Sequence, residues 1–171
     1  CMDRAGVVGA DGPTHHGVFD LSFMSSFPGM IVSAPKDGNE LRNLIATALN
    51  SKKNFSIRYP KDTSRKYNEN KSAEILQIGS WEIVHKGIES AILAVGSMVG
   101  MILDAKDKLY SELGYLPTII NARFIKPLDF ELLIEICKNH TNIITIEEGV
   151  LTGGFGSSVS SFLHDNQLNN K

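Results

Sequence analysis

The residues best suited to chemistry gather in one glycine-rich stretch near the start of the chain, at positions 3–20. The stretch reads D-R-A-G-V-V-G-A-D-G-P-T-H-H-G-V-F-D, and its side chains of interest are Asp3, Arg4, Asp11, His15 and His16. Arginine binds anions through a planar fork of donors, and histidine changes charge near neutral pH. Such a gathering is typical of part of an active site, with a solvated surface turn as the alternative.

The backbone of this stretch is predicted to be an ordered loop. It contains four glycines and one proline, and the D-G-P string at 11–13 is a turn signal. Glycine lets a chain turn sharply or approach a ligand closely, whereas proline fixes φ. We therefore expect a loop that presents polar groups, and neither a strand nor a helix.

Two more cations flank the end of a predicted strand, in the string R-Y-P-K. They are Arg58 and Lys61. Strand ends are where α/β folds place chemistry, and a guanidinium together with an ammonium can hold a phosphate. A solvated strand end is the alternative interpretation, and the spacing alone does not decide between the two.

The remaining motifs favour structural roles. The string G-V-L-T-G-G-F-G at 149–156 precedes a predicted helix, but it has neither dinucleotide-binding nor P-loop spacing, so a tight turn is favoured. Glu147 and Glu148 end a predicted strand, and we expect an interface or structural role for them. The sequence shows no metal-ligand cluster, and Cys1 and Cys137 make no disulfide framework.

The elements that must position the loop follow it directly. The pattern predicts a helix over 19–27 and strands over 30–33 and 55–59, with another helix between the strands. Asp37 is expected to cap that second helix, with Glu40 as its capping-box partner. The apolar stripes are Phe19, Phe23 and Phe27 in the first helix and Leu41, Leu44, Ile45, Ala48 and Leu49 in the second. This order of elements is typical of a parallel α/β sheet.

A second α/β unit is predicted after the polar segment 61–72. Its strands are expected at 75–78, 81–85, 91–95, 117–121 and 142–147, and its helices at 96–114, from Pro127 onward and at 157–163. We assign residues 1–62 to the first unit, 63–73 to a linker and 74–171 to the second unit. The fold class is therefore α/β, with two parallel-sheet units.

The composition is that of an ordinary globular protein. The 171 residues are 42% hydrophobic and 21% charged, with a formal net charge of −2. So small a net charge implies no field for nucleic acid or a membrane surface, and no apolar run approaches the roughly 20 residues of a membrane helix. The chain starts inside the loop without an initiator Met, so we expect a piece of a longer protein.

Five strings in order make a more specific pattern. They are residues 3–20, P-G-M-I-V-S-A-P-K-D-G-N-E-L, R-Y-P-K, N-A-R-F-I-K-P-L-D and E-E-G-V-L-T-G-G-F-G-S. Together they resemble the 1-deoxy-D-xylulose-5-phosphate synthases, a family of transketolase-like thiamine diphosphate enzymes. The resemblance covers nearly the whole chain. It implies the end of a pyrimidine-binding domain followed by most of a transketolase C-terminal domain.

The resemblance implies a reaction and a cofactor. In this family thiamine diphosphate attacks pyruvate, carbon dioxide leaves, and the remaining unit adds to D-glyceraldehyde 3-phosphate. The product feeds non-mevalonate isoprenoid biosynthesis and thiamine biosynthesis. The ligands of the cofactor and of Mg²⁺ are expected upstream of residue 1, so we expect this piece alone to be inactive.

The resemblance also implies roles for single residues. Arg4 matches the family's phosphate-binding arginine, and Lys61 stands where many members carry a second one. Lysine keeps the charge but loses the bidentate geometry. Asp11 and His15 match residues that face the substrate, the first as a partner for a hydroxyl and the second as a proton shuttle. Arg58 is expected to be a further phosphate contact.

The resemblance finally implies partners and a compartment. We expect a homodimer that acts on pyruvate and D-glyceraldehyde 3-phosphate, with no nucleic-acid or membrane partner. The compartment would be a bacterial cytoplasm, or a plastid or apicoplast-like organelle in a eukaryote. Two alternatives stay open. One is another transketolase-like enzyme, either a transketolase or the β-subunit of a 2-oxo-acid dehydrogenase, and the other is a non-catalytic α/β dimerisation module.

Overall fold

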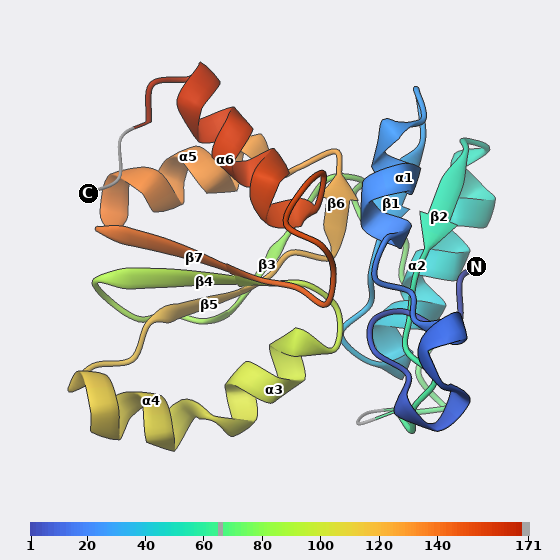
Figure 1. Ribbon diagram of the computed structural model, residues 1–171, viewed down its shortest axis with the longest axis horizontal. Coiled ribbons are helices and arrows are strands. Elements are labelled where there is room, and N and C mark those ends of the chain that lie inside the picture. The colour runs from blue at the N-terminus through green and yellow to red at the C-terminus, as the bar shows by residue number, and fades with distance from the viewer. Residues whose placement is uncertain (65–66, 169–171) are drawn as a thin grey trace.

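The computed structural model describes residues 1–64 and 67–168, which form two small sheets flanked by helices (Figure 1). The first sheet has the strand order β2-β1-β6, and the second has the order β3-β5-β4-β7. The predicted α/β class is confirmed. Within the described ranges, no helix is both long and apolar enough to cross a membrane.

The first sheet is built around two parallel strands that are joined by a helix. Its elements in chain order are α1 (Asp20–Ser26), β1 (Ile31–Ser33), α2 (Gly38–Ser51) and β2 (Phe55–Ile57). The predicted cap of α2 is confirmed, because the Asp37 carboxylate accepts a hydrogen bond from the Glu40 backbone N–H at 2.9 Å. The Glu40 carboxylate in turn accepts one from the Lys36 backbone N–H at 2.7 Å. The first bond satisfies an N–H group that a helix start leaves without a partner, and the second ties the residue before the cap to the first turn of α2.

A third strand of this sheet comes from much later in the chain. Strand β6 (Phe124–Lys126) pairs antiparallel with β1, at the edge of the first sheet that is nearer the second sheet in Figure 1. The Lys126 ammonium donates to the backbone carbonyls of Ser25 and Phe27, each at 2.7 Å. The second half of the chain therefore completes the sheet of the first half, which the sequence pattern did not predict.

The second sheet has three parallel strands and one antiparallel edge. Its strands are β3 (Glu82–His85), β4 (Ser90–Ala94), β5 (Thr118–Asn121) and β7 (Asn142–Ile146), and only β3 runs antiparallel to its neighbour. Its helices are α3 (Met98–Asp104), α4 (Lys106–Leu113), α5 (Phe130–Asn139) and α6 (Phe155–Asp165). Figure 1 shows α3 and α4 on one face of the sheet and α5 and α6 on the other. Four of the five strands predicted for this half are confirmed.

Two local predictions in the second half are wrong. Residues 75–78 form no strand, since this segment lies along α2, where the Leu76 backbone N–H donates to the Thr47 hydroxyl at 2.9 Å. Pro127 does not open a helix. It follows a cis peptide bond at the end of β6, and α5 begins later, capped by the Asp129 carboxylate. Pairing of β6 with β1 keeps the chain extended to this point.

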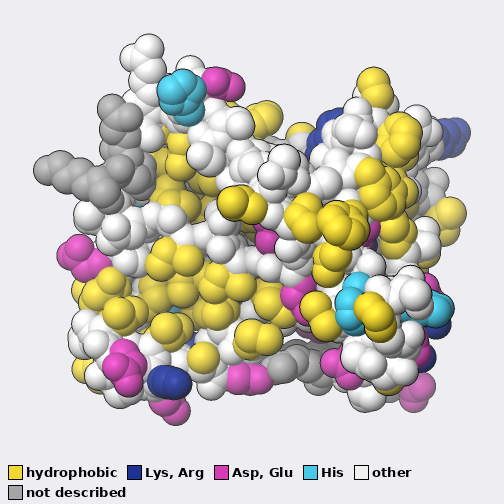
Figure 2. Space-filling view, viewed as in Figure 1, with side chains coloured by type: hydrophobic (Ala, Val, Ile, Leu, Met, Phe, Trp, Pro, Cys, Tyr) yellow, Lys and Arg dark blue, Asp and Glu magenta, His cyan; other side chains and the backbone are white. Residues whose placement is uncertain are grey.

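The apolar stripe predicted for the first helix does not face the core. Phe19, Phe23 and Phe27 are 63%, 46% and 50% exposed, whereas the helix buries Asp20 and Leu21 instead. Figure 2 shows hydrophobic side chains gathered over α1. In the second helix the stripe is also shifted: Leu44 is buried, whereas Ile45 and Leu49 are 39% and 79% exposed. Helical spacing indicates which residues share an apolar face, but it does not show whether that face packs against the core.

A network of charged side chains joins the start of α2 to the second sheet. The Asn121 amide donates to the buried Glu40 carboxylate at 2.7 Å, and the Lys36 ammonium donates to Glu82 at 2.5 Å. Partial burial raises the pKa of Glu82, but Lys36, Asn121 and Arg123 outweigh this and lower it below its ordinary value. Both members of the Lys36–Glu82 pair are therefore charged near neutral pH.

Candidate functional site

The glycine-rich loop folds as predicted, without a long helix or strand. It contains two short 3₁₀ turns, at Gly9–Asp11 and Pro13–His15. Its base is closed by two backbone bonds between Gly6 and Gly17, at 3.0 and 2.9 Å. A side chain at Gly17 would collide with the backbone carbonyl of Arg4, so the close approach of the two ends requires glycine there.

The loop is held against the end of strand β2. The Ala5 backbone N–H donates to the Tyr59 carbonyl at 3.1 Å, and the Met2 backbone pairs with the segment at Arg58. Inside the loop, Nδ1 of His16 accepts a hydrogen bond from the Val8 backbone N–H at 2.9 Å. His16 was one of the polar side chains of interest in the loop, and the structure shows that it connects two segments of the loop.

Arg4, Asp11 and Lys61 form one ion-paired cluster. The Asp11 carboxylate lies between the two cations, 2.7 Å from Nε of Arg4 and 2.5 Å from Nζ of Lys61. The Lys61 hydrogen bond, with the charges of Lys61 and Arg4, lowers the pKa of Asp11 below its ordinary value against the opposing effect of burial. The Asp3 carboxylate lies 2.6 Å from the other side of the Arg4 guanidinium. The fold thus brings together residues 50 positions apart in sequence.

The cluster is accessible to a ligand. The side chains of Arg4 and Lys61 are 35% and 49% exposed. Exposed ion pairs contribute little stability, so an incoming anion can replace a carboxylate partner without a large cost. A phosphate group, with its several acceptor oxygens and its greater charge, is well matched to a guanidinium and an ammonium held around one point.

His15 lies on the same loop but has no described contact with this cluster. It is exposed, and its Nδ1 lies 3.0 Å from the Thr14 hydroxyl. His15 is the last residue of the second 3₁₀ turn, and its backbone N–H donates to the Gly12 carbonyl at 3.2 Å. The structure therefore places His15 at the solvent side of the loop, with the neighbouring Thr14 hydroxyl beside its ring.

Arg58 is in a different environment from the one expected of a phosphate contact. Its side chain is 5% exposed, and its Nε donates to the buried Asp20 carboxylate at 2.6 Å. Its Nη2 donates to the backbone carbonyls of Gly17 and Glu148, at 3.1 and 3.0 Å. These bonds hold the guanidinium inside the protein. The geometry therefore favours a structural role for Arg58 over the expected phosphate contact, because it ties the loop to Asp20 and Glu148.

The glycine turn before α6 holds a carboxylate where a phosphate-binding turn would hold its anion. The Glu147 side chain accepts hydrogen bonds from the backbone N–H groups of Phe155 and Gly156, at 2.9 and 2.8 Å. A helix N-terminus attracts negative charge, and here the protein supplies it. This arrangement supports the structural interpretation of residues 149–156 and the structural role expected for Glu147.

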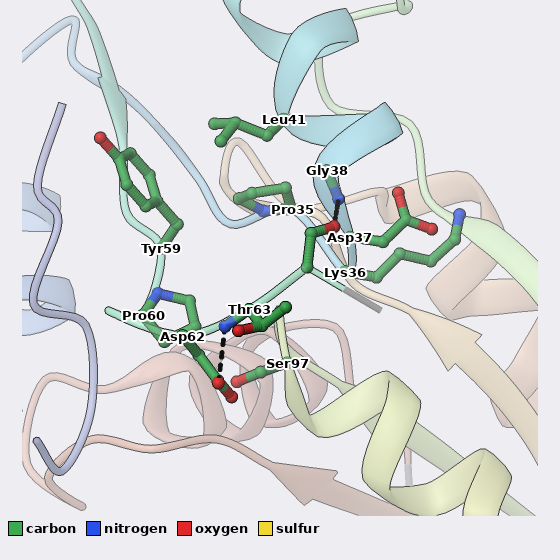
Figure 3. Close-up of a pocket in the computed structure, with 11 residues that line it drawn as sticks. Pro35, Lys36, Asp37, Gly38, Leu41, Tyr59, Pro60, Asp62, Thr63 and Ser97 are labelled. Atoms are coloured by element: carbon green, nitrogen blue, oxygen red, sulfur yellow. Dashed lines mark hydrogen bonds between the residues drawn. The ribbon is translucent and has the colours of Figure 1, made fainter. Parts of the chain in front are cut away.

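A pocket of about 120 Å³ lies near the site but does not include it. Figure 3 shows it between the start of α2 and the segment after β2, with Ser97 contributed by the second half of the chain. The Gly38 backbone N–H donates to the Ser64 hydroxyl at its edge, at 2.9 Å. Its lining contains neither Arg4, Asp11, His15 nor Lys61, so the cluster faces solvent and not this pocket.

Two family models match consecutive parts of the chain. The transketolase pyrimidine binding domain matches residues 1–66, and the transketolase C-terminal domain matches residues 79–171. A solved structure described as a split gene transketolase, inactive beta4 tetramer, is similar over 95% of this chain and 52% of that one, with a TM-score of 0.82 and 27% sequence identity.

Curated relatives share a single name. The 1-deoxy-D-xylulose-5-phosphate synthase of Syntrophus aciditrophicus is 47% identical over 98% of this chain, and those of Dehalococcoides mccartyi and Aquifex aeolicus are 46% and 45% identical over 99% and 94% of it. The chain spans only about a quarter of each relative, 26%, 26% and 25%. On the domains it matches and the fold it adopts, the chain belongs to the transketolase family.

Proposed function

We propose that this chain is part of a 1-deoxy-D-xylulose-5-phosphate synthase, which joins pyruvate to D-glyceraldehyde 3-phosphate with loss of carbon dioxide. The observation that carries the proposal is the exposed cluster of Arg4 and Lys61 around Asp11. Two cations around one carboxylate match the phosphate of the acceptor aldehyde. The shared name of the curated relatives supports the same reaction.

Three residues of the loop, together with Lys61 after β2, have a part in this proposal. Arg4 and Lys61 bind the acceptor phosphate, Arg4 through its fork of donors and Lys61 as a point charge. Asp11 keeps the two cations together before the phosphate arrives, and then accepts a hydrogen bond from a substrate hydroxyl. His15 transfers a proton at the oxygen that develops from the aldehyde.

The cofactor is proposed to be held mainly by other parts of the longer protein. Bound thiamine diphosphate supplies the carbon nucleophile that takes the two-carbon unit from pyruvate. In the described part of this chain, no three His, Cys, Asp or Glu side chains group in a way that suits a metal ion, so we assign none of them to Mg²⁺. The loop residues bind and orient the acceptor, and the isolated 171-residue chain is expected to show no turnover.

A second copy of the protein is proposed to cover the exposed face of α1. Phe19, Phe23 and Phe27 give this helix an apolar surface that a monomer rarely leaves in water. The similar solved structure is described as a tetramer. We therefore propose a homodimer for this protein.

We also propose the domain boundaries. Residues 1–62 form the end of one domain, 63–73 form a linker and 74–171 belong to the next domain.

The test compares acceptors in the full-length protein. Measurable product from pyruvate and D-glyceraldehyde 3-phosphate is expected, with a much higher KM for D-glyceraldehyde, which lacks the phosphate. Arg4→Ala and Lys61→Ala should remove most of this preference. Activity with a lipoyl acceptor, or transfer from a ketose phosphate without loss of carbon dioxide, would instead favour one of the other transketolase-like enzymes. Unchanged acceptor kinetics in both variants would favour a non-catalytic module.

A further inference from the structure

Glu148 is the one member of the Glu147–Glu148 pair that reaches the loop. Its carboxylate accepts hydrogen bonds from the Val7 backbone N–H at 3.4 Å and from the Ser97 hydroxyl at 3.3 Å. Its backbone carbonyl accepts from the Arg58 guanidinium at 3.0 Å. One residue from the end of β7 thus touches the loop, the start of α3 and the buried arginine.

The loop backbone is shaped around this carboxylate. Gly6 has φ of +75°, and a Cβ added there would lie 2.5 to 2.7 Å from the carboxyl carbon and both oxygens of Glu148. Real side-chain atoms do not approach so closely, so a side chain at Gly6 would displace the Glu148 carboxylate from this position. Gly6 also makes both backbone bonds to Gly17 that close the base of the loop.

The segment between Arg4 and Asp11 is therefore held at two neighbouring amides from two sides. Glu148 accepts from the N–H of Val7, and His16 accepts from the N–H of Val8. The first brace comes from the second half of the chain and the second from the loop itself. Because Arg4 and Asp11 lie on either side of these amides, a shift of the segment changes the distance between them.

We propose that Glu148 is a positioning residue for acceptor binding. Its carboxylate fixes Gly6 and Val7, and through them the spacing of Arg4 and Asp11, so that the cation cluster matches a phosphate. The Ser97 contact makes this spacing depend on how the second half of the chain sits against the loop. The inference rests on the proposed function, since it assigns Glu148 a part in binding the same acceptor.

The experiment uses the full-length enzyme with Glu148→Ala and Glu148→Gln. Loss of one hydrogen bond to a charged group changes binding by about tenfold, so Glu148→Ala should raise the KM for D-glyceraldehyde 3-phosphate by about that factor. The KM for D-glyceraldehyde and for pyruvate should stay near the wild-type values. Glu148→Gln should recover most of the loss, because its amide oxygen can still accept the Val7 hydrogen bond.

Glu147→Gln is the matched control, because its carboxylate caps α6 and contacts neither the loop nor the cluster. It should leave the acceptor KM unchanged. Hydrogen exchange of the amides at 5–8 gives a second readout that needs no turnover. Faster exchange there in Glu148→Ala, with near wild-type exchange in Glu148→Gln and Glu147→Gln, supports the inference even where a variant is too unstable for kinetics.

The inference is overturned when Glu148→Ala matches the wild type in either measurement, the exchange at 5–8 or the acceptor KM. Its failure is separable from failure of the proposed function. If wild-type enzyme discriminates the phosphorylated acceptor and Arg4→Ala loses this discrimination, the proposed function stands whatever Glu148 does. If Arg4→Ala has no effect, the proposed function itself fails.

Discussion

Two arginines at the loop are each paired with an aspartate. In the protein interior, Arg58 and Asp20 form an ion pair in which both side chains are at most 5% exposed. Near the surface, Arg4 and Lys61 share Asp11, and the side chains of Arg4, Asp11 and Lys61 are 35%, 16% and 49% exposed. The same chemical groups thus occur at similar distances in opposite environments.

The comparison distinguishes an ion pair that holds the structure together from one that a ligand can reach. A buried charge needs partners, because leaving it unpaired is costly, and three bonds from Arg58 reach a carboxylate and two carbonyls. Such a group is fixed and unavailable to a ligand. A partly exposed pair is weaker and is screened by water, so a ligand can replace one of its partners. The proposed phosphate contact is therefore assigned to Arg4 because of its exposure, and not because of its residue type.

The largest expected effect is on stability, from the buried pair. Arg58→Met leaves the Asp20 carboxylate buried without its cation, so the free energy of unfolding should fall by about 3–5 kcal/mol. Denaturant unfolding of the full-length protein measures this. Adding Asp20→Leu should recover part of the loss, because it removes the unpaired charge. A loss below about 1 kcal/mol in Arg58→Met would show that the pair resembles a surface ion pair.

The next effect is on acceptor binding, from the exposed cluster. Arg4→Ala removes a charged contact to the phosphate, so the KM for D-glyceraldehyde 3-phosphate should rise by about 10- to 100-fold. Its unfolding free energy should fall by about 1 kcal/mol, less than in Arg58→Met, because the ion pairs it breaks are only partly buried. Steady-state kinetics and denaturant unfolding of one preparation check both. Large destabilisation with an unchanged KM would reverse the roles assigned to Arg4 and Arg58.

Lys61 allows a smaller change in the same cluster. Lys61→Arg restores a bidentate fork, so the acceptor KM should fall by a few-fold, whereas Lys61→Ala should raise it. The substitution is on an exposed side chain, so stability should be unaffected. An Arg variant that binds the acceptor more weakly than wild type would mean that the site is shaped for the shorter reach of an ammonium around Asp11.

The smallest effect concerns pH. The pKa of Asp11 lies below its ordinary value of 3.8, owing first to the Lys61 hydrogen bond. The favourable free energy of the Asp11 ion pairs is thus fully present above this ordinary pKa. It is lost only as the pH falls through the lowered pKa. The acceptor KM of wild type and Asp11→Asn should therefore keep a constant ratio between about pH 5 and pH 8. A change in that ratio near pH 6 would require a raised pKa for Asp11, in conflict with its two cationic neighbours.

Local signals in the sequence were sufficient for several features. Asp37 followed by Glu40 indicated the start of α2, and glycines with D-G-P indicated the loop. Such signals act within a few residues, through hydrogen bonds and φ preferences that any context preserves. The strands at 30–33, 91–95 and 142–147 were found for a similar reason, because short apolar runs bounded by turns favour buried strands.

Features that depend on distant contacts were missed. Strand β6 pairs with a strand more than 90 residues earlier, and nothing in its own three residues indicates that partner. The phenylalanines of α1 have helical spacing, but spacing does not say which face the sheet covers. In the sequence, Glu148 is only a glutamate at the end of a predicted strand. Its contact with the loop becomes visible in the structure, where its carboxylate lies against Gly6.

The sequence by itself determined the α/β elements, the loop and the types of side chain that the loop carries. Tertiary structure alone decided that Lys61 meets Asp11, that Arg58 is buried and that Glu148 braces the loop. The physical reason is that a side chain's charge belongs to the residue, whereas its burial and partners belong to the fold. A cation becomes a ligand-binding group or a structural one only when the rest of the chain has packed around it.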